Sequence, residues 1–368
     1  MRKLVTIAMA VLGCSMATAM ASSPQDRTKI HIYSATDTWA IAPLIELFQR
    51  QHPSIDIDYV EFDTTPLFKT VVENRNNAAF EADIVISSAM DLQVKLVNMG
   101  LAYSFVSSHR DENPKWAQWR DELYGFTYEP VAVVYNVKAF TGRTLPKTHS
   151  DLASSLRDDS AFFNGRIGTY DVRGSGVAYL FAAQDAIQGY QTFRLTESFG
   201  RAKAKVFCRT SDMVDHVATG DLVLSYNVIA SYALAAARHE PRIGVHFLSD
   251  YTLVMSRSAF IPKTSQHKNE AMEFIEFLLS QDGQSSIAQK SSLIPIRPLA
   301  RHGIAAFKDL DDGHSSFIPI KLGTGLLAYL DTLKKRNFLQ DWEAAMALPA
   351  TPPGARPSCD AMPTAPGR

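Results

Sequence analysis

The sequence predicts an α/β protein built from two doubly wound lobes that are joined by two crossing strands. Strand and helix patterns alternate from residue 29 to residue 99, and the alternation starts again near residue 150. Two extended runs, 124–136 and 251–261, are apolar or small on both faces. A strand that is apolar on both faces is buried on both faces. We therefore expect each run to carry the chain from one lobe to the other.

The first residues have the pattern of a secretory signal peptide. Two basic residues precede the apolar run of residues 4–13, which is too short to span a bilayer. Small residues follow, and we predict cleavage after Ala21, so that residues 1–21 form the signal peptide. A Gram-negative host would then place the mature protein in the periplasm. Lipidation at Cys14 stays open as an alternative.

Composition and charge limit the possible partners. The chain has 368 residues, 46% apolar and 20% charged, which fits two domains with a well-developed core. Its formal net charge is −1 and its pI is near 6.8. Such a chain has no basic stripe for a phosphate backbone, so no nucleic-acid partner is expected.

Motifs for catalysis, for a cofactor or for a structural metal are missing from the sequence. It contains no G-x-S-x-G elbow, no G-x-x-x-x-G-K-[ST] loop and no H-x-x-x-H pair. Cys208 and Cys359 lack the C-x-x-C spacing of a zinc site, and whether they pair stays open. We therefore predict no enzyme activity, no cofactor and no metal site.

The first α/β series is predicted to form lobe 1. Its strands are 29–34, 54–62 and 83–87, and its helices are 39–51, 66–78 and 90–99. The run at 124–136 is expected to be one continuous strand, with residues 127–129 as the floor of a cleft. Lobe 1 is predicted to comprise residues 29–128 plus 255–300, with a strong amphipathic helix at 269–279.

The second series is predicted to form lobe 2, residues 129–254. Its strands are expected at 165–170, 205–207 and 222–226, and its helices at 150–156, 177–186, 211–219 and 229–238. Residues 301–348 are predicted to form C-terminal helices, one at about 325–336 and one at 339–347. The Pro-rich residues 349–368 are predicted to be a disordered tail.

In open parallel sheets, ligands bind at the carboxyl ends of the strands, where helix N-termini favour anions. Four places in the sequence fit this rule, and hydroxyl, guanidinium or glycine backbone groups stand at each. The alternative at each place is structural: helix capping, an ordinary turn or a core tyrosine. The complete set of predicted ligand residues, including those of the two crossing runs, is Ser34, Thr36, Ser87, Ser88, Tyr128, Glu129, Arg173, Ser175, Gly176, Tyr226, Asn227 and Tyr251.

Six stretches of the sequence carry a resemblance to a known family: 32–34, 82–96, 127–136, 168–185, 224–234 and 250–263. They resemble the type 2 periplasmic solute-binding proteins of ABC transporters, in the ferric-iron-binding branch. SSAMDLQ and YNVIASYA are also similar to stretches of the phosphoglycerate-transport regulatory proteins. The resemblance implies the type 2 periplasmic binding protein fold, a ligand held between the lobes, and a monomer that serves an inner-membrane ABC permease or sensor kinase.

The sequence thus predicts a periplasmic receptor that closes on a small anionic ligand, a phosphorylated oxyanion. Ferric iron is the alternative ligand, but the adjacent tyrosines of many iron-binding members are missing here. Tyr226 and Tyr232 are six residues apart. An exported hydrolase is a more distant alternative, for which the sequence provides no nucleophile beside a base.

Overall fold

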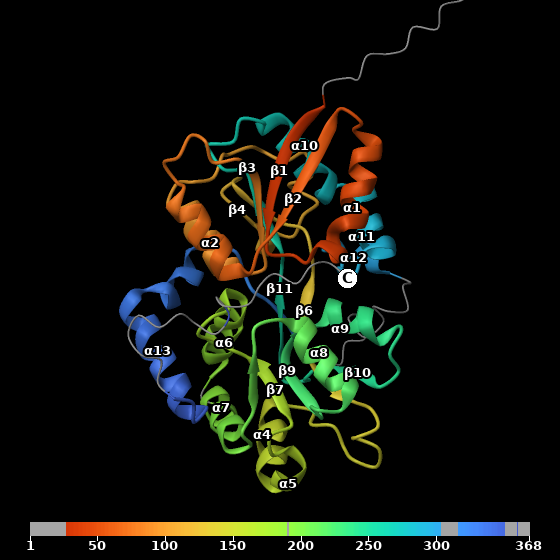
Figure 1. Cartoon of the computed structure of the whole chain (residues 1–368), viewed down its shortest axis with the longest axis vertical. Helices are drawn as coiled ribbons and strands as arrows, with labels where there is room; N and C mark the ends of the chain where they lie inside the picture. The colour runs from red at the N-terminus through yellow and green to blue at the C-terminus, as the bar shows by residue number, and fades with distance from the viewer. Residues whose placement is uncertain (1–26, 190, 303–315, 350–358, 360–368) are drawn as a thin grey trace, which may run out of the picture.

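The computed structural model describes residues 27–189, 191–302, 316–349 and 359. It consists of two halves, each with its own mixed β-sheet covered by helices, stacked along the long axis of the molecule (Figure 1). This arrangement confirms the predicted α/β fold of two lobes. The predicted signal peptide lies outside the described residues, as does the predicted tail except for residues 349 and 359.

The sheet of lobe 1 has the strand order β2-β1-β3-β12-β5-β4. The first three strands along this order are parallel, and the others pair antiparallel. Their bounds are β1 (Thr28–Ser34), β2 (Ile55–Glu61), β3 (Ala82–Ser87), β4 (Gln118–Trp119), β5 (Leu123–Gly125) and β12 (Ser258–Phe260). The helices are α1 (Thr38–Gln51), α2 (Thr64–Glu73), α3 (Met90–Asn98), α10 (Lys268–Leu279), α11 (Gln281–Lys290) and α12 (Pro298–Arg301), with a 3-10 turn η1 (Lys115–Ala117).

The sheet of lobe 2 has the order β13-β11-β6-β9-β7-β8, and β10 also pairs with β6. Its strands are β6 (Glu129–Asn136), β7 (Ile167–Tyr170), β8 (Lys205–Phe207), β9 (Leu224–Ile229), β10 (Ile243–His246), β11 (Thr252–Met255) and β13 (Phe317–Pro319). The helices are α4 (His149–Asp158), α5 (Ser160–Phe163), α6 (Gly176–Gln188), α7 (Gln191–Arg201), α8 (Thr210–Thr219) and α9 (Ala230–Ala237). Of these, α5 and α7 were not predicted.

Helical periodicity explains how α1 packs. Ile41, Leu44, Ile45 and Phe48 recur at three- and four-residue spacing, and all four are buried. They join the core between the sheet of lobe 1 and α10, where Phe48 meets Phe274 at 5.0 Å between ring centroids. Burying side chains of this size stabilises the fold by about 1.5–3 kcal/mol each.

The predicted single strand over 124–136 is wrong. β5 belongs to the sheet of lobe 1 and β6 to that of lobe 2, and residues 126–128 join them. The predicted run at 251–261 is likewise divided, because residues 256–257 separate β11 from β12. The pattern concealed both breaks, because the chain stays buried on both faces where it leaves one sheet for the other.

These two short connections form a paired hinge. The N–H of Phe126 donates to the carbonyl of Arg257 at 3.0 Å. The N–H of Arg257 donates to Oγ1 of Thr127 at 2.8 Å, and the N–H of Thr127 donates to Oγ of Ser256 at 3.3 Å. Backbone and hydroxyl groups thus replace the sheet ladder where the chain passes between the lobes.

The C-terminal part was predicted as two helices, 325–336 and 339–347. It instead contains a 3-10 helix, η3 (Thr324–Leu330), and one helix, α13 (Thr332–Ala345), which begins where Asp331 accepts from two backbone N–H groups. β13 adds a strand to the sheet of lobe 2, and α13 lies beside α6 and α7 (Figure 1). No helix in the part of the chain that the structure describes is both long and apolar enough to cross a membrane.

Candidate functional site

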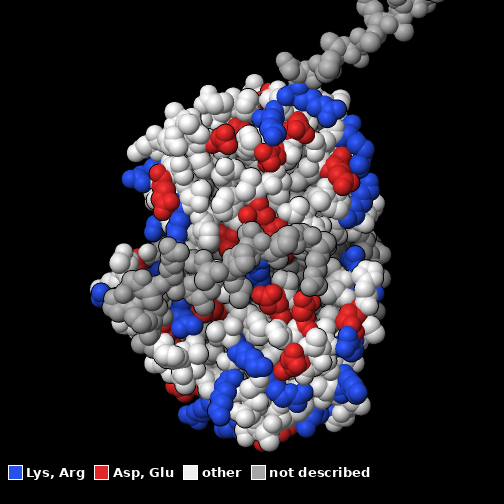
Figure 2. All heavy atoms as spheres, viewed as in Figure 1, with Lys and Arg blue, Asp and Glu red and all other residues white. Residues whose placement is uncertain are grey.

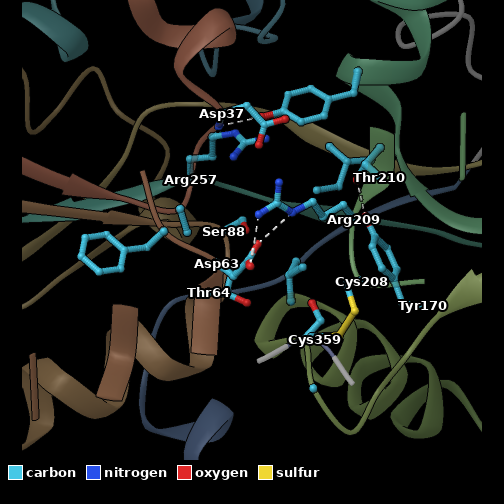
Figure 3. A pocket seen from close by; sticks show the side chains of 17 residues that line it. Asp37, Asp63, Thr64, Ser88, Tyr170, Cys208, Arg209, Thr210, Arg257 and Cys359 are labelled. Carbon is cyan, nitrogen blue, oxygen red and sulfur yellow. Dashed lines mark hydrogen bonds and ion pairs between the residues drawn. A yellow bond between two sulfur atoms is a disulfide. The ribbon is translucent and has the colours of Figure 1, made fainter. Parts of the chain in front are cut away.

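A pocket lies between the two lobes, at the carboxyl ends of β1, β2 and β3 on one side and of β7 and β8 on the other (Figure 3). The cavity has a volume of about 60 Å³ and is partly open to solvent. The described residues that line it are Ala35, Asp37, Phe62, Asp63, Thr64, Ser88, Tyr170, Gly174, Ser175, Val177, Cys208, Arg209, Thr210, Ile229, Tyr232, Arg257 and Cys359.

Helix N-termini converge on this cleft pocket. The residues that precede α1, α2, α6, α8 and α9 all line it, namely Asp37, Asp63, Ser175, Arg209 and Ile229. Neither aspartate caps its own helix through its side chain. The first turn of a helix has N–H groups without intrahelical partners and carries a partial positive charge. Helices from both lobes therefore make the pocket favourable for an anion.

Arg257 brings a buried cation to the pocket. Its side chain is only 1% exposed, although the residue lines the cavity. Its Nη1 donates to Thr36 Oγ1 at 3.0 Å, and its Nε donates to Glu129 Oε1 at 3.4 Å. Its Nη2 has no hydrogen-bond partner among the described residues. A buried charged donor without an acceptor is costly, so this nitrogen is suited to an anionic ligand.

Glu129 lies behind Arg257 and is fully buried. Burial raises the pKa of Glu129, an effect that the nearby Arg257 opposes. Burial alone would lower the pKa of Arg257, but its interactions with Tyr232, Glu129 and Asp37 raise it. The guanidinium also lies 5.0 Å from the centroid of the Tyr232 ring. Glu129 thus holds Arg257 in place from the hinge side rather than lining the pocket itself.

Three polar contacts join the lobes across the pocket. Arg209 at the start of α8 makes a two-pronged ion pair with Asp63 before α2, with both N–O distances at 3.2 Å (Figure 3). The N–H of Gly176 donates to Thr64 Oγ1 at 2.9 Å. The N–H of Asp37 donates to the hydroxyl of Tyr232 at 3.2 Å. These contacts hold the lobes in a closed arrangement.

A disulfide stands at the edge of the same pocket. Cys208, which follows β8, is bonded to Cys359, and their Cα atoms are 5.4 Å apart. The pairing that the sequence left open is therefore formed. Among the described residues, no group of three or more His, Cys, Asp or Glu side chains is placed to hold a metal ion.

Five of the predicted ligand residues lie in or directly beside the cleft pocket. Ser88 and Ser175 line it, and Oγ of Ser175 accepts from the N–H of Ala178 as the cap of α6. Thr36 accepts from Arg257, Gly176 donates to Thr64, and Glu129 pairs with Arg257, so these three shape the pocket from behind. Their direct contact with a ligand stays a prediction.

Two further predicted residues are engaged in turns. Ser34 Oγ accepts from the N–H of Thr36 at 3.1 Å, and Ser87 Oγ accepts from the N–H of Ala89 at 3.1 Å. Both serines are buried at strand ends and neither lines the cleft pocket. The structural alternative considered for these hydroxyls describes their position well.

Tyr226, Asn227 and Tyr251 lie away from the cleft pocket, around a buried carboxylate of lobe 2. Asp185 accepts from the Tyr226 hydroxyl at 3.0 Å, from Asn227 Nδ2 at 2.8 Å and from the Tyr251 hydroxyl at 3.1 Å. Burial raises the pKa of Asp185, and these hydrogen bonds oppose that effect. A buried carboxylate needs such donors, so the three side chains are engaged inside lobe 2.

Arg173 and Tyr128 also point elsewhere. Arg173 makes a two-pronged ion pair with Asp171 at 2.8 and 2.7 Å and lies 3.8 Å from Glu343 of α13. The Tyr128 ring lies 4.2 Å from the guanidinium carbon of Arg301. Neither residue lines the cleft pocket. The sequence suggested that Arg173 binds the anionic ligand, but its guanidinium is already paired with the carboxylate two residues earlier.

The predicted ligand residues include neither Arg209 nor Arg257. Arg209 stands where the strand at 205–207 ends and the next helix begins, so the strand-end rule applied there would have found it. Arg257 interrupts a run that is otherwise apolar or small, and a charge within a buried run needs a partner or a function. Both signals were present in the sequence, but neither identified the residue as part of the ligand pocket.

The chain is similar to a solved substrate-binding protein of an ABC transporter from Agrobacterium tumefaciens. It is 31% identical, superposes with a TM-score of 0.81, and the match covers 88% of this chain and 96% of that one. Iron-bound HitA from Pseudomonas aeruginosa is 20% identical, with a TM-score of 0.68 and coverage of 86% and 99%. AfuA from Actinobacillus pleuropneumoniae, solved with fructose-6-phosphate, is 14% identical, with a TM-score of 0.67 and coverage of 88% and 99%. The last two likenesses show the fold alone.

No curated protein matches the chain. The family model for the bacterial extracellular solute-binding proteins matches residues 44–310, which is more than half of the chain. This match agrees with the two-lobed fold and with the pocket between the lobes. The chain therefore belongs to the bacterial extracellular solute-binding protein family, as a periplasmic or extracellular receptor of an ABC transporter.

Proposed function

We propose that this receptor captures a small phosphorylated oxyanion between its lobes and presents it, as a monomer, to an inner-membrane ABC permease. The observation that carries the proposal is the free Nη2 of Arg257, buried at a pocket toward which helix N-termini of both lobes point. A phosphoryl group accepts several hydrogen bonds at once, and it matches the planar fork of arginine. A sensor kinase is the alternative membrane partner.

The remaining polar groups of the pocket fit the same ligand class. Ser88 and Thr210 bring hydroxyl groups from opposite lobes, and Arg209 brings a second guanidinium. A ligand held by groups of both lobes is bound best when the lobes are closed. Exclusion of water would strengthen each charge-assisted bond.

Ferric iron is the weaker candidate. Two guanidinium groups line the pocket beside the carboxylates of Asp37 and Asp63, and among the described residues no cluster of three or more His, Cys, Asp or Glu side chains is placed to hold a metal ion. The hydroxyls of Tyr226 and Tyr251 donate to Asp185 instead of facing the cleft. HitA was solved with iron and AfuA with a sugar phosphate. These ligands belong to those proteins, and here they serve only to choose the two ligand classes that are compared.

Isothermal titration tests the proposal with 2- and 3-phosphoglycerate, glucose-6-phosphate, inorganic phosphate and ferric citrate. We expect at least one phosphorylated compound to bind with micromolar affinity, about −8 kcal/mol, and iron not to bind. Arg257→Lys keeps the charge near Glu129 but loses the fork, and it should weaken binding by about tenfold or more.

Arg242→Gln is the matched control, because Arg242 pairs with Glu240 outside the pocket. The control should bind like the wild type. Binding of ferric ion in the absence of any phosphorylated ligand would overturn the proposal. So would a folded Arg257→Lys protein with unchanged affinity.

A further inference from the structure

The disulfide is part of the surface of the cleft pocket. Both Cys208 and Cys359 line the cavity, and Cys359 is only 4% exposed. The two are 151 residues apart in sequence, so the bond brings a residue from the C-terminal end of the chain to the ligand cleft. Cys359 is the only described residue beyond Arg257 that lines the pocket.

Gly174 shows how closely Cys359 is seated. A Cβ added at Gly174 would lie 2.7 Å from both Cβ and Sγ of Cys359, and 3.2 Å from its backbone nitrogen. Non-bonded heavy atoms at such distances overlap, so only glycine allows this approach. Gly174 directly precedes Ser175, the cap of α6. The disulfide therefore packs against the N-terminal end of a helix that we assign to the ligand site.

The other half of the bond reaches a second helix. Cys208 directly precedes Arg209, whose guanidinium pairs with Asp63 across the cleft. The next residue, Thr210, is where α8 begins. The disulfide thus lies between the starting points of α6 and α8, and all of these residues line one cavity (Figure 3). It occupies space next to the groups that would meet an anion.

We infer that the Cys208–Cys359 disulfide is a wall of the ligand pocket that determines how large a ligand the receptor accepts. The inference rests on the proposed function for the class of ligand, and it adds that the receptor selects its ligand by size. A side chain tied by a covalent bond cannot move aside for a larger ligand, whereas an untied side chain can. A change of one methylene in the space beside a bound group alters the discrimination between two ligands by about 10- to 200-fold.

The first experiment compares ligands of increasing size. Affinities for 3-phosphoglycerate and glucose-6-phosphate are measured by isothermal titration for the wild type and for the Cys208→Ser/Cys359→Ser double variant. We expect the ratio of the two affinities to shift by about tenfold or more in favour of the larger ligand when the bond is absent. If both affinities fall by the same factor while the thermal midpoint drops, the disulfide only stabilises the fold and the inference is wrong.

A second experiment needs no ligand, so that failure of the proposed function and failure of this inference can be told apart. Ser88→Cys places a thiol in the pocket, and it is made in the wild-type background and in the double-variant background. Mass spectrometry first confirms that Cys208 and Cys359 remain bonded in the former. The labelling rates are then measured with a small and with a bulky methanethiosulfonate.

The small reagent should react at similar rates in both backgrounds. The bulky reagent should react more slowly where the disulfide is intact, by about tenfold if the wall limits entry as it limits binding. Equal rates for the bulky reagent in the two backgrounds would overturn the inference that the disulfide is a wall of the pocket, even if phosphorylated ligands bind. A wild-type protein that binds no phosphorylated compound, with the expected labelling difference, would overturn the proposed ligand but support the wall.

Discussion

Buried charges are the residues on which the site depends most directly. Arg257 lies in the connection 256–257, and Glu129 is the first residue of β6, directly after the other connection. They are 1% and 0% exposed, and each needs the other because neither reaches water. A buried ion pair is not a strong source of stability in itself, but removing one partner leaves the other charge uncompensated. The pair therefore links the stability of the hinge to the charge presented to the ligand.

Glu129→Gln should accordingly destabilise the protein. We expect the free energy of unfolding to fall by about 3 kcal/mol, because Arg257 would keep its charge without a carboxylate. Urea unfolding followed by circular dichroism measures this. Glu240→Gln, at an exposed ion pair with Arg242, is the control and should change little. Equal small effects of both substitutions would show that the buried pair is energetically unimportant.

Asp91 gives a pH dependence outside the pocket. It is 3% exposed on α3, and burial raises its pKa from 3.8 to about 6. The folded state therefore holds this proton more tightly than the unfolded state. Asp91 contributes stability below pH 3.8, and this contribution is lost as the pH rises through 6.

Asp91→Asn stays neutral and should keep that contribution. Relative to the wild type, the variant should gain about 2 kcal/mol in free energy of unfolding between pH 4 and pH 7. Chemical denaturation at the two pH values measures the change. A difference between variant and wild type that is the same at both pH values would refute the prediction.

The ends of strands and the starts of helices from both lobes meet at the cleft pocket. The carboxyl ends of β1, β2 and β3 face those of β7 and β8, so helices of both lobes start at one pocket. The ion pair of Asp63 and Arg209 connects the start of α2 to the start of α8. It holds the lobes together without being part of either core.

Asp63→Asn should shift the ligand-free protein toward an open arrangement. The uncharged amide would lose the two-pronged ion pair with Arg209, and small-angle X-ray scattering should detect a larger radius of gyration. Arg209→Gln should have the same effect, and the double variant should add nothing further. Asp58→Asn, which removes an exposed pair with Lys29 within lobe 1, is the control. Additive effects of the two cleft substitutions would contradict a shared contact.

The whole molecule behaves as two bodies that meet at a hinge and at a cleft. Residues 126–128 and 256–257 form the hinge, and buried apolar side chains of both lobes, such as Leu92 and Val177, belong to one continuous cluster. On the face shown in Figure 2, acidic and basic side chains are interspersed over both halves. Neither half therefore presents a single sign of charge on this face.

Gly176 is a position where closure leaves no room for added volume. A Cβ there would lie 2.7 Å from Leu92 Cδ1 and 3.1 Å from Thr64 Oγ1, both across the cleft. Gly176→Ala should therefore prevent full closure and weaken ligand binding. In a thermal-shift assay, the wild type at 100 times its Kd should gain about 2.7 kcal/mol, and the variant at the same ligand concentration should gain less. Gly142→Ala is unsuitable as a control, because its φ of +76° would add strain.

Gly325→Ala is the matched control, since nothing lies within 4 Å of the added Cβ. It should leave the ligand-induced shift unchanged. An unchanged shift in Gly176→Ala would show that the lobes do not need to approach this closely.

The sequence by itself determined the α/β fold, the two passages between the lobes and the strand ends at which the pocket lies, because these follow from periodicity and from local turn chemistry. It identified Ser88 and Ser175, which line the pocket, through that same rule. It did not reveal that Tyr226 and Asn227 donate to Asp185, or that Asp171 forms an ion pair with Arg173.

Only the tertiary structure decided that Arg209 meets Asp63, that Arg257 keeps a free Nη2 at the cleft, and that Cys359 reaches Cys208. Those outcomes depend on which distant segments pack together, and local patterns carry no record of long-range contacts.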